Sequence, residues 1–209
     1  DEYLDAFNEP STTLVDTDGK GVERITATGV VVSGVEYEVD CIIYASGFEV
    51  GTPFNERNGY DPAGRGGVRL SEYWNGGMRT LHGNVVHGFP NLFINQMTQG
   101  ANLISNVPHN LTEGGRTIAM TIRHALDVGA KEVEVTEEAE EKWLDLLLSG
   151  PGRMLGANNN CTPGYYNNEG QPLGDGASLF VGYPAGAMAF FQYIEGWRSN
   201  GAFEGLEFH

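Results

Sequence analysis

Two segments of the chain place residues that could hold a ligand just after an expected strand. The first is the apolar run at residues 41–45 (CIIYA), which ends at Ser46-Gly47. The second is the run at residues 92–94 (LFI), which leads through a polar loop to a helix cap at Ser105 or Asn106. In an open α/β sheet, ligands bind at the carboxyl ends of strands. The helix start offers unpaired N–H groups and a positive dipole end, which suit an anionic or electron-rich ligand atom.

The usual nucleotide-binding motifs are absent from the sequence. The glycine-rich residues 64–67 (GRGG) and 174–176 (GDG) lack the third glycine and the preceding strand of a dinucleotide fingerprint. No P-loop, HExxH or GxSxG motif occurs. Any nucleotide site therefore lacks its phosphate-binding half here. An ordinary strand–loop–helix turn without a ligand remains an alternative interpretation of both segments.

The histidines and clustered acidic residues form no catalytic or metal-binding pattern. The five histidines include no pair at helical i, i+3 or i+4 spacing, so each is expected to have an ordinary polar role. They are His82, His87, His109, His124 and His209. The four acidic residues near position 140 are expected to form a solvated helix face. They are Glu137, Glu138, Glu140 and Glu141.

The two cysteines, Cys41 and Cys161, lie far apart and show no CxxC or CxxH spacing. Two buried thiols in a reducing, cytoplasmic setting are expected, rather than a disulfide or a zinc site. Residues 161–170 concentrate aromatic residues, amides and glycines in one loop. Such a loop is typical of a binding site, and an Ω-loop packed on its own tyrosines is the alternative.

Composition excludes several classes of protein. Lysine and arginine number 12 and aspartate and glutamate 28, so the net charge is −16. This charge argues against binding to nucleic acid or to anionic lipid. The sequence contains no run of about 18 apolar residues, so it predicts no membrane span. The first residues lack the features of a signal peptide. Glycine is frequent, at 30 of 209 residues, which suggests many tight turns or backbone close to a ligand.

Strands that would position these segments follow from turn residues and apolar runs. Residues 25–32 and 36–39 flank residues 33–35 (SGV), which predicts a hairpin. The run at 41–45 does not alternate with polar residues, which is typical of a parallel strand covered on both faces. Further short strands are expected at residues 68–70, 85–86, 92–94, 132–135 and 179–181.

Three helices are predicted after residue 100. The first is capped at Ser105 or Asn106, has Pro108 in its first turn and ends at Gly129. Its glycines 114 and 115 each cost about 1 kcal/mol relative to alanine. The second is capped by Thr136 and stops at residues 150–152 (GPG), and the third spans about 187–199. The expected buried faces are Ile118, Ile122, Ala125 and Leu126 in the first helix, and Trp143, Leu144, Leu147 and Leu148 in the second.

Taken in order, these segments resemble flavin-dependent Baeyer–Villiger monooxygenases and, more broadly, the flavin-containing monooxygenase group. The matching pieces are residues 3–8 (YLDAFN), 14–16 (LVD), 25–30 (ITATGV), 36–48 (EYEVDCIIYASGF), 88–93 (GFPNLF), 105–106 (SN) and 204–205 (EG). The resemblance covers nearly the whole chain and rests on the order and spacing of the pieces. Ser46 stands where the family usually has threonine, which exchanges one hydroxyl for another.

The resemblance implies an α/β fold, namely the C-terminal part of a Rossmann-like fold with two dinucleotide-binding domains for FAD and NADP. Residues 1–47 would be the end of the NADP-binding domain with its crossing strand. Residues 48–209 would be the C-terminal half of the FAD-binding domain with the loops of the substrate pocket. Both glycine fingerprints, the diagnostic histidine motif and the active-site arginine of the family would lie upstream, in a missing N-terminal portion.

The resemblance also assigns roles to individual positions, none of them catalytic or metal-binding. The cofactor-binding positions are Ser46, Gly47, Gly100, Ala101, Asn106 and Val107. The substrate positions are Asn102, Leu103, Ile104 and Cys161. Residues 100–104 correspond to a flexible bulge beside substrate and flavin, and the helix start at Asn106 would turn its N–H groups to the flavin pyrimidine ring. Cys161 stands where many relatives have a tryptophan near the nicotinamide. For Leu103 and Ile104, a place in an ordinary core is an equal alternative.

The activity that the resemblance implies is the insertion of oxygen into a ketone to give an ester or lactone, with FAD and NADPH as cofactors. This chain would close the flavin site and shape the substrate pocket, with the missing N-terminal portion and a small ketone as partners. Alone it is expected to be inactive. The alternatives are an N- or S-oxygenating flavin monooxygenase, a pyridine-nucleotide reductase and a non-catalytic binding module of the same architecture.

Overall fold

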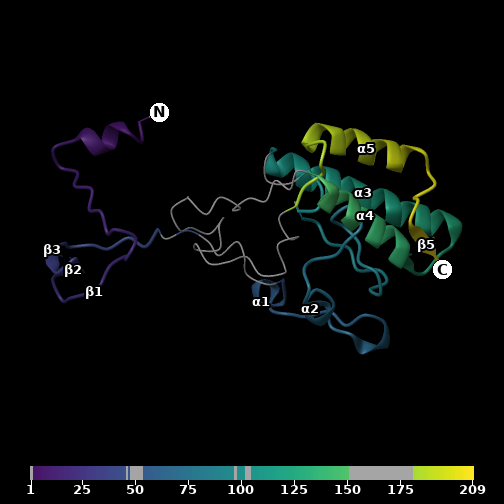
Figure 1. Cartoon of the computed structure of the whole chain (residues 1–209), viewed down its shortest axis with the longest axis horizontal. Helices are drawn as coiled ribbons and strands as arrows, with labels where there is room; N and C mark the ends of the chain where they lie inside the picture. Colours follow the sequence, from purple (N-terminus) through teal and green to yellow (C-terminus); the bar gives the residue numbers. More distant parts are fainter. Residues whose placement is uncertain (1, 46, 48–53, 97, 102–104, 151–180) are drawn as a thin grey trace. The chain divides into compact units, whose positions relative to one another are not determined.

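The structure, a computed structural model, describes residues 2–45, 47, 54–96, 98–101, 105–150 and 181–209. The chain divides into two units, Asp1–Glu49 and Val50–His209 (Figure 1). The boundary predicted at residues 47 and 48 lies close to this division. The assignment of the two parts to an NADP-binding and an FAD-binding domain stays a prediction.

The first unit contains a three-stranded antiparallel sheet. The short 3-10 helix η1 (Asp5–Asn8) precedes the strands β1 (Arg24–Ile25), β2 (Gly29–Val32) and β3 (Val35–Glu38), which lie in the order β1-β2-β3. Ser33 and Gly34 connect β2 to β3 with φ values of 51° and 76°. Positive φ at both turn positions matches the twist of a two-residue hairpin, so the predicted hairpin is confirmed. The strand expected at 25–32 is instead two strands, because the chain turns at residues 26–28.

The parallel strand predicted at residues 41–45 is wrong for this structure. These residues form no strand and are exposed, with Ile43 at 84% and Tyr44 at 77%. Cys41 is also exposed, contrary to the expected buried thiol. A strand of this kind needs a neighbouring strand with which to form hydrogen bonds. The sheet of this unit contains only β1 to β3 among the described residues, and none of these strands pairs with residues 41–45.

The second unit is mainly helical. Its elements are α1 (Phe54–Asn58), η2 (Arg65–Gly67), α2 (Leu70–Tyr73), α3 (Val107–Val128), β4 (Val133–Val135), α4 (Glu137–Ser149), α5 (Ala187–Ser199) and β5 (Leu206–Phe208). The predicted short strand at 132–135 is confirmed as β4, which pairs antiparallel with β5. The sequence patterns did not predict β5. No described helix is long and apolar enough to cross a membrane.

Three other predicted strands are absent, and a fourth cannot be assessed in full. Residue Leu70 begins α2 instead of ending a strand, and the Glu72 carboxylate accepts a hydrogen bond from the N–H of Arg69 at the helix start. Val85 makes single bridges to Leu81 and Phe93 rather than a ladder. Of the strand expected at 179–181, only Val181 lies within the described residues, and it is not in a strand. Glycine-rich turns interrupt this region before a ladder can extend.

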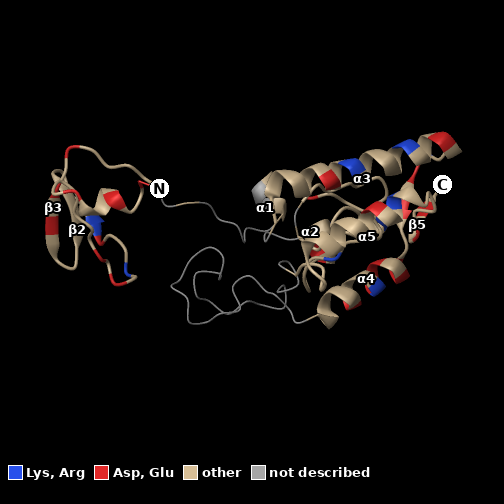
Figure 2. Ribbon diagram, turned by 90° about the horizontal axis from the view of Figure 1, so that it is seen from above, with Lys and Arg blue, Asp and Glu red and all other residues tan. Residues whose placement is uncertain are grey.

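The long helices confirm the predicted caps. Asn106 caps α3 and Gly129 ends it in the left-handed conformation, with φ of 76°. Thr136 caps α4 by accepting a hydrogen bond from the N–H of Ala139. The third predicted helix is confirmed as α5, which lies alongside α3 in both views (Figures 1 and 2).

The core of the second unit lies between α4, α5 and the β4–β5 pair. Its buried members include Trp143 and Leu147 of α4, Ile194 and Trp197 of α5, and Val135 of β4. Aromatic rings dominate, and Trp143 lies close to Tyr183, Phe190 and Tyr193. The face predicted for α4 is confirmed for Trp143 and Leu147, whereas Leu148 is exposed.

The face predicted for α3 is mostly wrong. Ala125 is buried as expected, but Ile122 is 41% and Leu126 is 67% exposed. The buried residues of α3 are instead Asn110, Thr117, Thr121 and Ala125. The helix is therefore rotated so that a polar stripe packs inside this chain and an apolar stripe faces outward.

Candidate functional site

The site residues predicted from the sequence belong to both units of the chain. Gly47 belongs to the first unit, is exposed and has a φ of 87°. Gly100, Ala101, Asn106 and Val107 belong to the second unit. The predicted positions Ser46, Asn102, Leu103, Ile104 and Cys161 lie outside the described residues.

The N-terminus of α3 is capped and exposed. The Asn106 side chain accepts a hydrogen bond from the His109 N–H at 3.0 Å, and the Asn106 carbonyl accepts one from the Asn110 N–H at 3.0 Å. Asn106 and Val107 are both exposed. The first turn of α3 carries no acidic residue, whereas that of α4 carries three. The positive end of the α3 dipole is thus not compensated by the helix itself, which favours an electron-rich group placed there.

Gly100 and Ala101 directly follow a buried turn at Gln99, which is held by hydrogen bonds. Gln99 is wholly buried and has a φ of 59°. Its side-chain oxygen accepts a hydrogen bond from Thr80 Oγ1 at 2.5 Å, and its side-chain nitrogen donates to the Met78 carbonyl at 2.6 Å. The indole N–H of Trp143 donates to the Gln99 carbonyl at 3.1 Å. These bonds fix the point from which the predicted 100–104 bulge begins.

Gly100 lies against α5 in a way that a larger residue would disturb. A Cβ at this position would lie 3.0 Å from Cζ of Phe190. The Gly100 carbonyl accepts a hydrogen bond from the Tyr183 N–H at 2.8 Å. Ala101, next in the chain, is also buried, at 4% exposed. The small residues at 100 and 101 therefore let this segment approach the aromatic side chains of α5.

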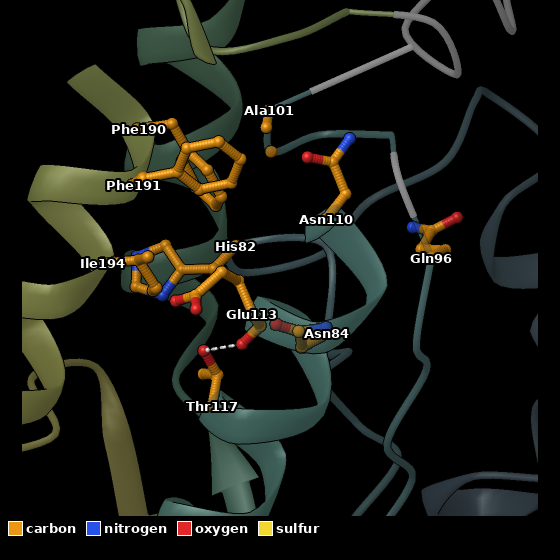
Figure 3. A pocket seen from close by; sticks show the side chains of 12 residues that line it. His82, Asn84, Gln96, Ala101, Asn110, Glu113, Thr117, Phe190, Phe191 and Ile194 are labelled. Carbon is orange, nitrogen blue, oxygen red and sulfur yellow. Dashed lines mark hydrogen bonds between the residues drawn. The ribbon is translucent and has the colours of Figure 1, made fainter. Parts of the chain in front are cut away.

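A cleft lies next to this turn, between α3 and α5 (Figure 3). Its volume accessible to a water-sized molecule is about 20 Å³. Its lining residues are His82, Asn84, Gln96, Gly100, Ala101, Asn110, Glu113, Gly114, Thr117, Phe190, Phe191 and Ile194. The residues from α5 are apolar, and those from α3 are polar or glycine. The structure thus brings predicted residues Gly100 and Ala101 together with Asn110, four residues past the helix cap.

The polar lining residues of α3 were missed by the sequence analysis. Asn110, Glu113 and Thr117 follow the cap Asn106 at spacings of four, three and four residues, which places them on one helix face. This run of polar residues was the available signal. The prediction for this helix rests instead on its apolar residues, which also recur at helical spacing.

His82 lies deep beside the cleft and is held uncharged. Its Nε2 lies 3.0 Å from the Tyr193 hydroxyl, and its ring packs edge-on against Trp143 and Trp197. Burial lowers the pKa of His82 to about 3. A histidine with this pKa stays neutral at physiological pH and does not exchange protons there. His82 therefore has the ordinary structural role expected for it: its ring packs against aromatic side chains and makes one polar contact.

A buried ion pair joins α5 to the polar side of α3. Arg198 is 0% and Glu113 is 12% exposed, and the guanidinium lies 2.7 Å from the Glu113 carboxylate. The same guanidinium donates to the Glu113 carbonyl and to Thr117 Oγ1, and it also pairs with Glu195. Only Nε of Arg198 lacks a partner among the buried side-chain atoms of the described residues. The pair orients Glu113 and Thr117 at the edge of the cleft.

Glu140 corrects the expectation of a solvated acidic face on α4. It is 0% exposed, and its carboxylate accepts hydrogen bonds from the Tyr73 hydroxyl at 2.6 Å and from the His87 N–H at 2.9 Å. Arg79 Nε donates to the same carboxylate at 3.3 Å. Burial and the neighbouring carboxylate raise the pKa of Tyr73. Glu140 is a structural anchor between α4 and α2, away from the cleft.

The described residues contain no group of three or more His, Cys, Asp or Glu side chains that could hold a metal ion. The chemistry available in the cleft is therefore hydrogen bonding, aromatic contact and the field of a helix N-terminus. These are means of binding and orienting a molecule. In the described part of the chain they include no nucleophile with an activating base.

Known proteins are similar to this chain along nearly its whole length. No family model matches the chain. Pentalenolactone D synthase of Streptomyces arenae is 46% identical over 209 residues, which cover 99% of this chain and 35% of that relative. The FAD-binding monooxygenase hmp7 of Hypomyces subiculosus is 42% identical, over 99% of this chain and 34% of its own length. Baeyer–Villiger monooxygenase 4 of Dietzia sp. is 41% identical, over 100% of this chain and 33% of its own length.

Solved structures agree with these sequence matches. The polycyclic ketone monooxygenase of Thermothelomyces thermophila superimposes with a TM-score of 0.80 at 32% identity, covering 100% of this chain and 34% of that one. An oxidized steroid monooxygenase bound to NADP gives a TM-score of 0.78 at 25% identity, covering 99% and 37%. The mixed helix and sheet arrangement of this chain is thus found within larger monooxygenases.

The chain therefore matches part of known flavin-dependent monooxygenases. Within that class, it is 41% identical along its whole length to a protein named Baeyer–Villiger monooxygenase 4 and 46% identical to a pentalenolactone D synthase. The chain spans about a third of the length of the curated relatives it matches and corresponds to their C-terminal part. The resemblance drawn from the sequence segments is confirmed.

Proposed function

We propose that this chain is the C-terminal part of an FAD- and NADPH-dependent monooxygenase that inserts one oxygen atom into a ketone to give an ester or lactone. The observation that carries the proposal is the 46% identity to pentalenolactone D synthase across 99% of the chain. Relatives named as FAD-binding and as bound to NADP support the two cofactors. We further propose that the fold of the complete enzyme is Rossmann-like, with residues 1–47 in the NADP-binding and 48–209 in the FAD-binding domain.

The second unit offers features that suit one side of a flavin. The start of α3 is exposed at Asn106 and Val107, and its first turn holds no carboxylate that would repel an electron-rich ring edge. Gly100 and Ala101 bring backbone without bulky side chains toward the same region. These residues, together with Ser46 and Gly47 of the first unit, are our proposed cofactor-binding positions. The phosphate-binding glycine motifs are not in this sequence, so the remaining contacts must come from other polypeptide.

FAD, when bound, supplies the activation of molecular oxygen with electrons taken from NADPH. The protein residues bind, orient and exclude water. We propose that the N–H groups at the start of α3 stabilise negative charge on the flavin ring. Residues Asn102, Leu103, Ile104 and Cys161 are proposed to line the substrate pocket. The hydrogen bonds of the buried Gln99 side chain fix the point from which the predicted 100–104 bulge begins.

The names of the relatives favour ketone oxidation over N- or S-oxygenation. Three of the matched proteins are named after a ketone, a lactone or the Baeyer–Villiger reaction. None of the relatives cited above is named a disulfide or pyridine-nucleotide reductase. A small ketone is therefore the proposed substrate class, and the rest of the enzyme is the proposed partner.

A chimera tests the proposal. The matching third of the Streptomyces arenae synthase is replaced by this chain, and the purified protein is examined for flavin absorbance and for NADPH oxidation that depends on added ketone. We expect a yellow protein that converts a cyclic ketone to the lactone with one added oxygen atom, seen by mass spectrometry. An amine substrate should remain unchanged.

Two controls make the result decisive. The synthase without its matching third should lose flavin and activity, and this 209-residue chain alone should not oxidise NADPH when FAD is added. A colourless, soluble chimera, or NADPH oxidation by the chain alone, would overturn the proposal.

A further inference from the structure

α3 carries an apolar stripe on a face that the described residues cover only in part. The residues Val107, Leu111, Gly115, Ile118, Ile122 and Leu126 follow one another at spacings of four, four, three, four and four. Such spacing keeps them on one side of a helix for its whole length. We call these six residues the α3 stripe.

Three of the large apolar side chains of the α3 stripe are exposed to solvent. Leu126 is 67% exposed, Ile122 41% and Val107 37%. Leu111 and Ile118 are half-buried. The face that packs within the chain is instead built around Asn110, Thr117 and Thr121. A surface helix normally turns its apolar face inward, so this arrangement indicates that something outside the described structure covers the stripe.

The solvent face of α3 is a different, charged one. Arg123 and Asp127 pair there at 2.8 Å, and Arg116 pairs with Glu113 at 3.3 Å. Arg123 and Asp127 are more than half exposed. The helix thus has a polar face toward α5, a charged face toward water and an apolar face that the described residues leave exposed at Val107, Ile122 and Leu126. Three distinct faces on one helix are typical of an element packed on two sides.

We propose that the α3 stripe is the surface through which this chain packs against the remaining polypeptide of a Baeyer–Villiger monooxygenase. The inference rests on the proposed function. The curated relatives match nearly all of this chain with only about 33–35% of their length, so most of their chain is available as the occupant. The stripe begins at Val107, a proposed cofactor position, so the covering polypeptide would also approach the cofactor. A second copy of this chain is disfavoured by its net charge of −16.

Two exposed positions on α3 provide a matched pair of variants. Ile122 is 41% exposed and lies on the stripe, whereas Met120 is 37% exposed and lies about 160° away around the helix. Ile122→Glu and Met120→Glu add the same charge to the same helix at similar exposure. Neither change should lower the melting temperature of the chain alone by much, because neither side chain is buried.

The experiment co-expresses this 209-residue chain, carrying an affinity tag, with the part of the Streptomyces arenae synthase that lies outside the matched third. Co-purification and mass by light scattering report the complex. We expect a one-to-one complex with the unchanged chain and with Met120→Glu. With Ile122→Glu, the yield of complex should fall at least tenfold, because a carboxylate would be buried in an apolar contact.

Three outcomes would overturn the inference, and a fourth would overturn the proposed function alone. No complex with the unchanged chain, or equal yields with both variants, would show that the stripe is not this interface. A homodimer abolished by Ile122→Glu would identify a second copy as the occupant. A large loss of melting temperature in the isolated Ile122→Glu chain would show that the chain covers the stripe itself. A complex without flavin absorbance would leave the interface standing and overturn the proposed function instead.

Discussion

The hydroxyl of Thr80 donates a 2.5 Å hydrogen bond to the side-chain oxygen of Gln99, and both residues are wholly buried. Thr80 Oγ1 also accepts from the Gly83 N–H at 3.1 Å, so it links the turn at His82 to the turn at Gln99. His82 and Gln99 both have positive φ, at 55° and 59°. Strained backbone of this kind persists only where its surroundings hold it. The Thr80–Gln99 bond is thus one of the contacts that fix the start of the proposed cofactor loop.

Replacing Gln99 by Met should lower the free energy of unfolding by about 2–4 kcal/mol, because the Met78 carbonyl and the Thr80 hydroxyl would lose a buried partner. Thr80→Val should cost less. The double variant should be less destabilised than the sum of the two single variants by roughly 1 kcal/mol, since both break the same bond. Urea unfolding of the three variants measures the coupling. Strict additivity would show that the contact carries no energy of its own.

Stability should depend on pH through His82. Its pKa is about 3 in the folded chain, below the ordinary value of 6.5. Between these values the unfolded chain binds a proton that the folded chain does not, so acid favours unfolding. The contribution is fully present above the unfolded pKa and is lost as the pH falls from about 6.5 toward 3. From neutral pH to pH 5.5 it should decrease by about 1.4 kcal/mol.

The variant His82→Asn isolates this effect, because asparagine tolerates positive φ and does not titrate. Its free energy of unfolding should change less between pH 7.5 and pH 5.5 than that of the unchanged chain. His109, which is exposed, provides the control, and His109→Asn should keep the full dependence. Identical pH profiles for all three proteins would contradict a buried neutral His82.

Glu140 and Glu141 should respond very differently to the same change, although they are neighbours in sequence. Glu140→Ala removes the carboxylate that accepts hydrogen bonds from the Tyr73 hydroxyl, the His87 N–H and Arg79 Nε. Breaking such a buried cluster costs about 3–5 kcal/mol. Glu141 is 58% exposed, and solvent screens its contact with Arg79, so Glu141→Ala should have almost no effect. Thermal unfolding of both variants is the measurement, and similar melting temperatures would contradict the structural role of Glu140.

The features that the sequence could predict are those whose cause is local. Asn106, Gly129 and Thr136 act on the N–H and carbonyl groups beside them, and the Ser33-Gly34 turn needs only two residues with positive φ. These elements were predicted correctly because cap and turn chemistry does not depend on distant residues. The same holds for the existence of α5.

The features that the sequence could not predict depend on partners far away in the chain. Glu140 is buried because Tyr73 and His87, 67 and 53 residues away, supply donors. Ile122 and Leu126 look like core residues by their spacing, and their exposure depends on which polypeptide covers α3. The run at residues 41–45 has the composition of a buried strand, but a strand forms only beside others. In each case the local pattern is genuine and the missing information is the identity of the neighbour.

Of the two adjacent glycines in α3, only Gly114 is needed for the close approach of another side chain, and Gly115 only lowers helix propensity. A Cβ at Gly114 would lie 2.5 Å from Oδ1 of Asn95, whereas a Cβ at Gly115 would meet only Nδ2 of Asn95 at 3.8 Å. Asn95 also donates a hydrogen bond to the Leu111 carbonyl at 3.2 Å. Gly115→Ala should therefore stabilise the chain by about 0.5–1 kcal/mol, through the higher helix propensity of alanine.

Gly114→Ala should gain nothing, because Asn95 must turn away and lose its bond to Leu111, a loss of about 1 kcal/mol that offsets the helix propensity. Combining Gly114→Ala with Asn95→Ala removes the clash and should restore part of the gain. Urea unfolding of the four proteins measures the difference. Equal stabilisation by both glycine replacements would show that Asn95 moves without cost and that Gly114 is not required for its approach to α3.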